Sequence, residues 1–306
     1  MKILVTKGLG RFVEQDWSCA APDSDSIQVA SILTGVCRSD IDMMEGRFQL
    51  LPESMSGHEG LARVIAIGAN ITDVAVGDLV ATRGEPAYAD VYNVRAREYV
   101  QVPSAEPKYI LEPVACGINV VTGDIAELQG RALAEDNPKL LIVGSGFLAY
   151  VAYQTLKHYQ TEFAIDVVGS SNRDLWASLG VTLIDEPASD YSVVIVLKDT
   201  TCLMRDDIIK TNGLVIDAVE RSISRRESGN LLWKNVTTVR PSPRNNNFIG
   251  AMEEARYMIE HNIICVDKFW TRGYDRNTEW SQAFEDAVLR RNNYSRGYIV
   301  WSENVR

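Results

Sequence analysis

The pattern of hydrophobic and polar positions changes once along the chain. Up to about residue 119, short apolar runs are separated by Gly, Pro and Asp. This texture predicts an irregular antiparallel β domain, because half-buried strands are short and turn residues bound them. Its expected strands cover residues 26–33, 61–67, 78–81 and 98–102.

Beyond residue 140, runs of Val, Ile and Leu are separated by helical segments. Uninterrupted apolar runs are typical of parallel strands that are buried on both faces. The expected strands cover residues 140–143, 163–168, 181–184, 193–197 and 214–219, followed by a last strand at 297–301. The expected helices cover residues 150–159, 251–260 and 280–290. This βαβ series predicts an α/β protein with a doubly wound parallel sheet beside a β-rich domain.

Composition narrows the function. A chain of 306 residues with 46% hydrophobic content has room for two domains. A formal net charge of -10, from 31 basic and 41 acidic residues, argues against a nucleic-acid partner. The longest apolar stretch, 140–153, is too short and too interrupted to cross a membrane. The odd set of 5 cysteines without a C-x-x-C pair predicts reduced thiols in the cytoplasm.

The first chemical signal is Gly144-Ser145-Gly146-Phe147-Leu148-Ala149, a G-x-G-x-x-A turn between an apolar strand and a helix. Small residues let a pyrophosphate approach the backbone, and the helix N-terminus offers N–H donors. We interpret Gly144, Gly146, Phe147 and Leu148 as dinucleotide-binding; the alternative is a mere tight turn.

The second expected strand ends without the acid that usually binds the ribose 2′-hydroxyl of NAD. Asp166 comes too early, and Gly169, Ser170, Ser171 and Arg173 follow instead. Hydroxyl groups and a guanidinium can hold a 2′-phosphate, so NADP(H) is favoured over NAD(H). The alternative is an ordinary capped turn with a solvated Arg. The sequence also predicts that Gly169→Asp reverses the preference.

A second signal lies in the segments 35–40, Gly-Val-Cys-Arg-Ser-Asp, and 57–60, Gly-His-Glu-Gly. Thiolate, imidazole and carboxylate are the ligand types that zinc takes. Taken singly, Cys37 is more typical of a small buried hydrophobe and His58 of a satisfied polar residue.

With these letters, the sequence resembles the zinc-dependent medium-chain dehydrogenase/reductase family, above all its alcohol, sorbitol and threonine dehydrogenases. The ordered motifs are residues 35–40, 57–59, 76–80, 111–113 and the glycine turn. The resemblance implies a GroES-like catalytic domain over 1–119 and 265–306. It implies a Rossmann dinucleotide-binding domain over 120–264.

The resemblance also implies roles for single residues. Cys37 and His58 match the first two zinc ligands, and Glu112 matches the carboxylate ligand of the polyol dehydrogenases. Glu59 matches an acid beside or behind the metal. Cys116, one helical turn beyond Glu112, is an alternative third ligand.

Three residues next to Cys37 match further roles. Ser39 matches the hydroxyl that passes the substrate proton outward, Asp40 the acid that orients the ligand histidine, and Arg38 a pyrophosphate contact. The alternative for all three is a turn followed by a helix cap.

Some positions depart from the family pattern. No four-cysteine lobe lies between Asp78 and Glu112, so one catalytic zinc per chain is expected. Ala62 stands where the family usually has glycine, and the chain is shorter than typical members.

The implied activity is hydride transfer between NADP(H) and a small secondary alcohol or polyol, or its ketone, by a homo-oligomer, either a dimer or a tetramer. Phe48 would wall the substrate cleft, and Glu45 and Arg47 would bind hydroxyl groups or lie in a solvated loop. The alternatives are a zinc-free NADPH-dependent enone or quinone reductase and a catalytically silent NADPH-binding protein.

Overall fold

The computed structural model describes residues 1–6, 10–47, 56–245, 247–291 and 294–301. The chain divides into two compact units, Met1–Pro113 with Met252–Arg306 and Val114–Ala251. The predicted boundaries lie six residues later at the first junction and thirteen residues later at the second, because helices cross both junctions. No described helix has the length and apolar character needed to span a membrane.

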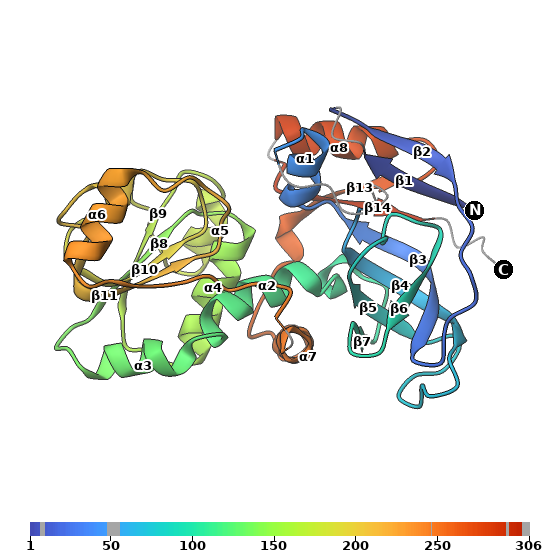
Figure 1. Cartoon of the computed structure of the whole chain (residues 1–306), viewed down its shortest axis with the longest axis horizontal. Coiled ribbons are helices and arrows are strands. Elements are labelled where there is room, and N and C mark those ends of the chain that lie inside the picture. The colour runs from blue at the N-terminus through green and yellow to red at the C-terminus, as the bar shows by residue number, and fades with distance from the viewer. Residues whose placement is uncertain (7–9, 48–55, 246, 292–293, 302–306) are drawn as a thin grey trace. The chain divides into compact units, whose positions relative to one another are not determined.

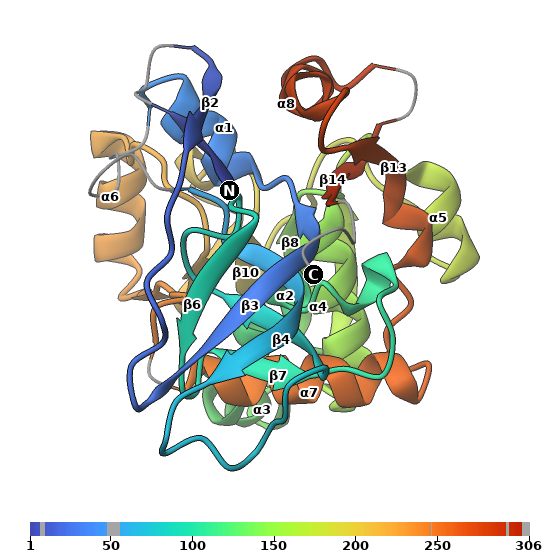
Figure 2. The same ribbon diagram turned by 90° about the vertical axis from the view of Figure 1, so that its right-hand side faces the viewer.

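The first unit is built on a seven-stranded sheet in the order β13-β14-β3-β4-β5-β7, with β6 also paired to β3. All pairings are antiparallel except β13 with β14. Figure 2 shows the long strand β3 between β4 and β6. The strands are β3 (Ser26–Gly35), β4 (Glu59–Ile67), β5 (Leu79–Arg83), β6 (Val91–Arg95), β7 (Tyr99–Gln101), β13 (Trp270–Asp275) and β14 (Arg296–Val300).

A two-stranded antiparallel sheet and several helices complete this unit. The remaining elements are β1 (Lys2–Thr6), β2 (Phe12–Asp16), α1 (Arg38–Met44), η2 (Pro107–Tyr109), η4 (Asp267–Phe269) and α8 (Trp280–Leu289). Two helices cross the junctions between the units, α2 (Glu112–Thr122) and α7 (Phe248–Glu260).

Two buried clusters hold the first unit together. One fills the sheet with apolar side chains such as Ile27, Val29 and Val64. The other joins the N-terminal hairpin to α8, where the Phe12 ring stacks on Phe284 with centroids 3.9 Å apart. The second cluster explains why the C-terminal segment returns to this unit: its apolar face is buried there.

The second unit is a parallel five-stranded sheet in the order β12-β11-β10-β8-β9 (Figure 1). Its elements are α3 (Ile125–Leu133), β8 (Lys139–Val143), α4 (Phe147–His158), β9 (Ala164–Val168), α5 (Arg173–Ser178), β10 (Tyr191–Val196), η3 (Cys202–Met204), β11 (Ile209–Asp217), α6 (Arg225–Trp233) and β12 (Thr237–Val239). The strand order reverses between β8 and β10, which is the switch point where doubly wound sheets bind ligands.

The α/β class and the two architectures are confirmed, and one expected strand is much reduced. Residues 181–184 contribute only an isolated parallel bridge between Ile184 and Val168. With that bridge, the sheet follows the order expected for a Rossmann fold. The pattern also missed short elements such as β12 and α6, because their residues are largely exposed and lack an apolar period.

Candidate functional site

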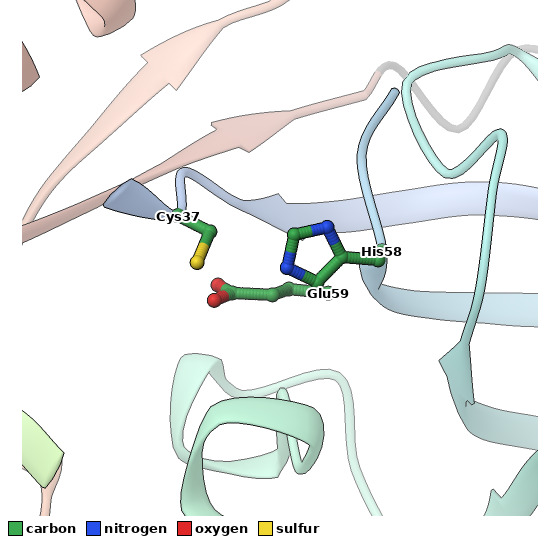
Figure 3. A group of neighbouring side chains, drawn as sticks. All are labelled: Cys37, His58 and Glu59. Carbon is green, nitrogen blue, oxygen red and sulfur yellow. The ribbon is translucent and has the colours of Figure 1, made fainter. Parts of the chain in front are cut away.

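Three potential metal ligands meet in the first unit. The ligand atoms of Cys37, His58 and Glu59 all lie within 4.8 Å of one another, and their side chains point toward a common centre (Figure 3). It is the one group of this kind among the described residues. A sulfur, a nitrogen and an oxygen donor form a set that suits zinc, so the side chains present fit the implied metal.

Local backbone geometry explains how these residues meet. Cys37 follows β3 and caps α1, while His58 immediately precedes Glu59, the first residue of β4, which pairs antiparallel with β3. Gly57 has φ 83°, and a Cβ there would lie 2.6 Å from the Tyr88 ring. Only glycine therefore suits the turn that delivers His58.

Asp40 sits behind the cluster and is fully buried. Its carboxylate accepts hydrogen bonds from the Tyr88 hydroxyl at 2.8 Å and from the N–H groups of Cys37 and Gly57 at 3.2 Å each. Its Oδ1 lies 3.7 Å from His58 Nδ1, which is beyond hydrogen-bond distance. Asp40 thus fixes the two ligand-bearing segments, and sequence reasoning missed its partner Tyr88.

The other two residues of the motif have partners of their own. The Ser39 hydroxyl donates to Cys37 Sγ at 3.2 Å, so its proton is directed at the candidate ligand. Arg38 Nε lies 3.2 Å from Asp42 Oδ1 on the exposed side of α1. The proton-relay role of Ser39 and the pyrophosphate contact of Arg38 stay predictions.

Glu59 carries a strong ion pair that the sequence did not reveal. Arg296, at the start of β14, donates through Nη2 to both carboxylate oxygens, to Oε1 at 2.5 Å. The Arg296 guanidinium also lies over the Trp270 ring, 4.9 Å from its centroid. The Glu59 side chain is fully buried, and Arg296 is the basic partner that compensates its carboxylate there. No local pattern links two residues 237 positions apart.

Glu59 and Glu112 are two candidates for the third metal ligand. Glu112 is buried at the start of α2 but is not part of the group within 4.8 Å. Burial by itself would lower the pKa of His58, but the charges of Asp40, Cys37 and Glu112 raise that pKa well above its ordinary value. Glu112 is therefore close enough to act on His58. Cys116 lies one turn later on the same helix, and the choice between Glu112 and Cys116 stays a prediction.

The thiol of Cys37 also resists ionisation. Burial, followed by the charge of Glu59, raises its pKa. Without a cation, the site therefore favours a neutral Cys37 thiol and a His58 imidazolium. A bound cation would displace one proton from each.

Three residues were predicted to line the substrate pocket, Glu45, Arg47 and Phe48. Arg47 Nη2 binds Asp42 Oδ1 at 2.7 Å and also pairs with Glu45. The two charged residues are thus paired with α1 and with each other, and their contact with substrate hydroxyl groups stays a prediction. Phe48 lies outside the described residues.

In the second unit, the glycine turn has the geometry of a phosphate site. Gly144 has φ 120°, a conformation that favours glycine. Gly146 is the N-cap of α4, which has no side-chain cap, and a Cβ at Gly146 would meet no atom within 4 Å. The turn thus leaves open space at a helix N-terminus, as a pyrophosphate requires, and Phe147 and Leu148 form the first turn of that helix.

Ser145 ties this turn to the segment that follows β9. Its Oγ lies 2.9 Å from Ser171 Oγ and accepts a hydrogen bond from Ser171 N at 3.1 Å. Its carbonyl accepts from Asn172 Nδ2 at 3.1 Å and from Trp176 Nε1 at 3.0 Å. Ser145 itself is almost completely buried. The sequence did not reveal this role of Ser145, because no motif in it places residues 145 and 171 in contact.

This packing corrects one expectation. A Cβ at Gly169 would lie 2.5 Å from the Ser145 Cβ and 3.0 Å from its N, so the turn has no room for a side chain. Gly169→Asp would disrupt the turn before it could alter cofactor preference.

The residues expected at the 2′-phosphate lie at the surface. Ser170 and Ser171 are exposed. Arg173 begins α5 and pairs through Nη2 with Asp185 Oδ1 at 3.0 Å. Hydroxyl and guanidinium groups are thus present, and the guanidinium already has a carboxylate partner.

Comparison with known proteins agrees with this geometry. Residues 23–106 match the alcohol dehydrogenase GroES-like domain. A probable quinone oxidoreductase of Leishmania amazonensis is 26% identical over 151 residues, which cover 48% of this chain and 42% of that protein. A mitochondrial enoyl-[acyl-carrier-protein] reductase of Homo sapiens is 31% identical over 107 residues, 34% of this chain and 28% of that protein. The chain thus matches less than half the length of either relative.

The whole fold matches a solved structure. The alcohol dehydrogenase TADH of Thermus sp. ATN1 superposes with a TM-score of 0.75 over 99% of this chain and 100% of that one, at 14% identity. Residues 23–106 thus belong to the alcohol dehydrogenase GroES-like domain family, and the chain has the fold of the medium-chain alcohol dehydrogenases, a GroES-like domain with a Rossmann-type parallel sheet.

Proposed function

We propose that the chain is a zinc-dependent oxidoreductase that transfers a hydride between NADP(H) and a secondary alcohol or polyol, or its ketone. The observation that carries the proposal is the Cys37–His58–Glu59 group in the unit that holds the GroES-like domain. A zinc-free reductase has no evident use for a half-buried thiol and imidazole and a buried carboxylate that share one centre.

When bound, zinc would supply a Lewis acid for an alcohol or carbonyl oxygen, and the nicotinamide would supply the redox chemistry. Cys37 and His58 would hold the metal together with Glu59 or Glu112. Asp40 keeps the two ligand-bearing segments in place. Ser39, 3.2 Å from Cys37 Sγ, would relay the substrate's hydroxyl proton during oxidation, accepting it while its own hydroxyl proton passes outward to water, and would relay a proton inward during reduction.

Metal analysis and binding measurements test this proposal together. Purified protein should carry about one zinc per chain. His58→Ala should lose the zinc and the turnover but keep NADPH binding, since the glycine turn belongs to the second unit. His261→Ala, an exposed histidine of the first unit, is the matched control and should change neither property. Metal-replete wild-type protein without zinc would contradict the assignment.

Substrate class is tested by turnover. Vicinal diols, sugar alcohols or the matching ketoses should exceed ethanol in kcat/KM by up to roughly 10⁴-fold, as expected for a site that binds a second hydroxyl. If ethanol or a simple aldehyde is the best substrate, the polyol assignment is wrong.

A zinc-free NADPH-dependent enone or quinone reductase is the second candidate. It is favoured by the similarity to a quinone oxidoreductase and an enoyl-[acyl-carrier-protein] reductase and by Arg296, which already neutralises the Glu59 carboxylate. In that case His58→Ala and chelator-treated protein would reduce quinones or enoyl thioesters with NADPH as fast as the untreated wild type. The two candidates thus make opposite predictions for one variant.

A further inference from the structure

The segment after β9 forms a small surface built from three parts of the second unit. Gly169 N donates to the Ile184 carbonyl at 3.2 Å, and Ile184 N donates to the Val167 carbonyl at 3.0 Å. These bonds place Asp185 beside the start of the 169–172 turn. Arg173 follows the same turn as the first residue of α5.

One ion pair closes this surface. Arg173 Nη2 lies 3.0 Å from Asp185 Oδ1, and the side chains keep 53% and 84% of their exposure. Both groups therefore remain accessible to a ligand. A carboxylate and a phosphate compete for the same guanidinium, because both present paired oxygens to its N–H groups.

The backbone beneath the pair is held in place. The Ser145 hydroxyl binds Ser171, and the Ser145 carbonyl binds Asn172 and the fully buried Trp176. Trp176 is packed edge-on against Tyr150, with centroids 5.4 Å apart. Because the turn cannot shift to accommodate a ligand, the charges at its rim set the preference between a 2′-hydroxyl and a 2′-phosphate.

We propose that Asp185 is a specificity-determining residue that weakens binding of the 2′-phosphate of an adenosine dinucleotide, by holding Arg173 and by repelling the phosphate. This inference rests on the proposed dinucleotide function of the second unit. The preference for NADP(H) is then the balance between Arg173, which attracts the 2′-phosphate, and Asp185, which opposes its binding. Removal of Asp185 should therefore strengthen that preference.

Calorimetric titration with 2′,5′-ADP and 5′-AMP tests the proposal without turnover. Asp185→Asn should raise the affinity for 2′,5′-ADP about 2- to 5-fold, the range expected from one exposed ion pair, and leave that for 5′-AMP unchanged. The gain should shrink as salt rises from about 0.05 to 0.5 M, because the groups are exposed.

Asp207→Asn is the matched control. Asp207 forms an exposed pair with Arg205 at 2.7 Å and precedes β11, which is separated from β9 by β10 and β8. It removes the same charge from the same unit and should not change either affinity. The Asp185→Asn gain should also fall in an Arg173→Leu background, since the competition needs the guanidinium.

Three results would overturn the inference. They are an unchanged affinity of Asp185→Asn for 2′,5′-ADP, an equal gain in Asp207→Asn, and an undiminished gain in the Arg173→Leu background. If the wild-type protein binds neither fragment nor either dinucleotide, the proposed function fails as well. That result is distinct from the other three, in which the wild type binds.

Discussion

The candidate metal centre and the glycine turn are built from different kinds of residue. The centre collects ionisable side chains from separate segments, with Glu59 balanced by Arg296 from β14. The turn uses small residues within one segment, with an interlocked Ser145 and open space at Gly146. The centre therefore depends on charge balance, whereas the turn depends on volume and hydrogen bonds. Substitutions in the two regions should therefore reduce stability or binding for different physical reasons.

The largest effect is expected from Arg296→Leu. It leaves the Glu59 carboxylate buried without its partner, which should cost about 3–5 kcal/mol of unfolding free energy. Urea denaturation of the metal-free protein measures this loss. Arg272→Leu breaks exposed pairs with Glu279 and Asp286 in the same unit and should cost no more than about 1 kcal/mol. Similar losses in both variants would show that burial does not distinguish the pairs.

A smaller loss is expected from Gly169→Ala, which tests volume alone. The added Cβ meets the Ser145 side chain and backbone, so overpacking should cost about 1–3 kcal/mol. Denaturant midpoints are compared with those of Gly229→Ala in α6, where a Cβ meets nothing within 4 Å. That control should stabilise the protein, since alanine favours helix over glycine. A neutral Gly169→Ala would mean that the turn is looser than the contacts indicate.

Asp40→Asn tests whether Asp40 supports zinc binding at the candidate metal centre. Loss of the charge behind His58 should weaken zinc binding about 10- to 100-fold, as is typical of residues that position ligands. Competition with a chromogenic chelator measures the affinity. Asp42→Asn, on the same helix but paired with Arg38 and Arg47, should leave zinc affinity unchanged. Equal affinities in wild type and Asp40→Asn would remove Asp40 from the proposed site.

The smallest effect is expected from Ser145→Ala. Loss of the hydroxyl contacts with Ser171 should cost about 0.5–1.5 kcal/mol of unfolding free energy. Ser178→Ala in α5 removes only a local bond to the Leu175 carbonyl at an exposed position and should have a lesser effect. If the two alanine variants are equally stable, Ser145 does not hold the two turns together.

The amino-acid sequence by itself determined the fold class, the family resemblance and the glycine turn. These features depend on local pattern: apolar runs specify buried strands, and Gly144-Ser145-Gly146 between a strand and a helix specifies the turn. Cys37 and His58 could also be selected as candidate ligands, because their neighbours form short motifs. These motifs can be recognised without the rest of the chain, because their residue types and spacing lie within one short segment.

Only the tertiary structure decided which distant side chains meet. The pairing of β14 with β3 brings Arg296 to Glu59, and the strand bridge at Val168 brings Asp185 to Arg173. The crowding of Gly169 by Ser145 likewise depends on packing between two turns. Strand pairing and register fix these contacts. The residue pattern along one segment specifies neither the partner strand nor the register.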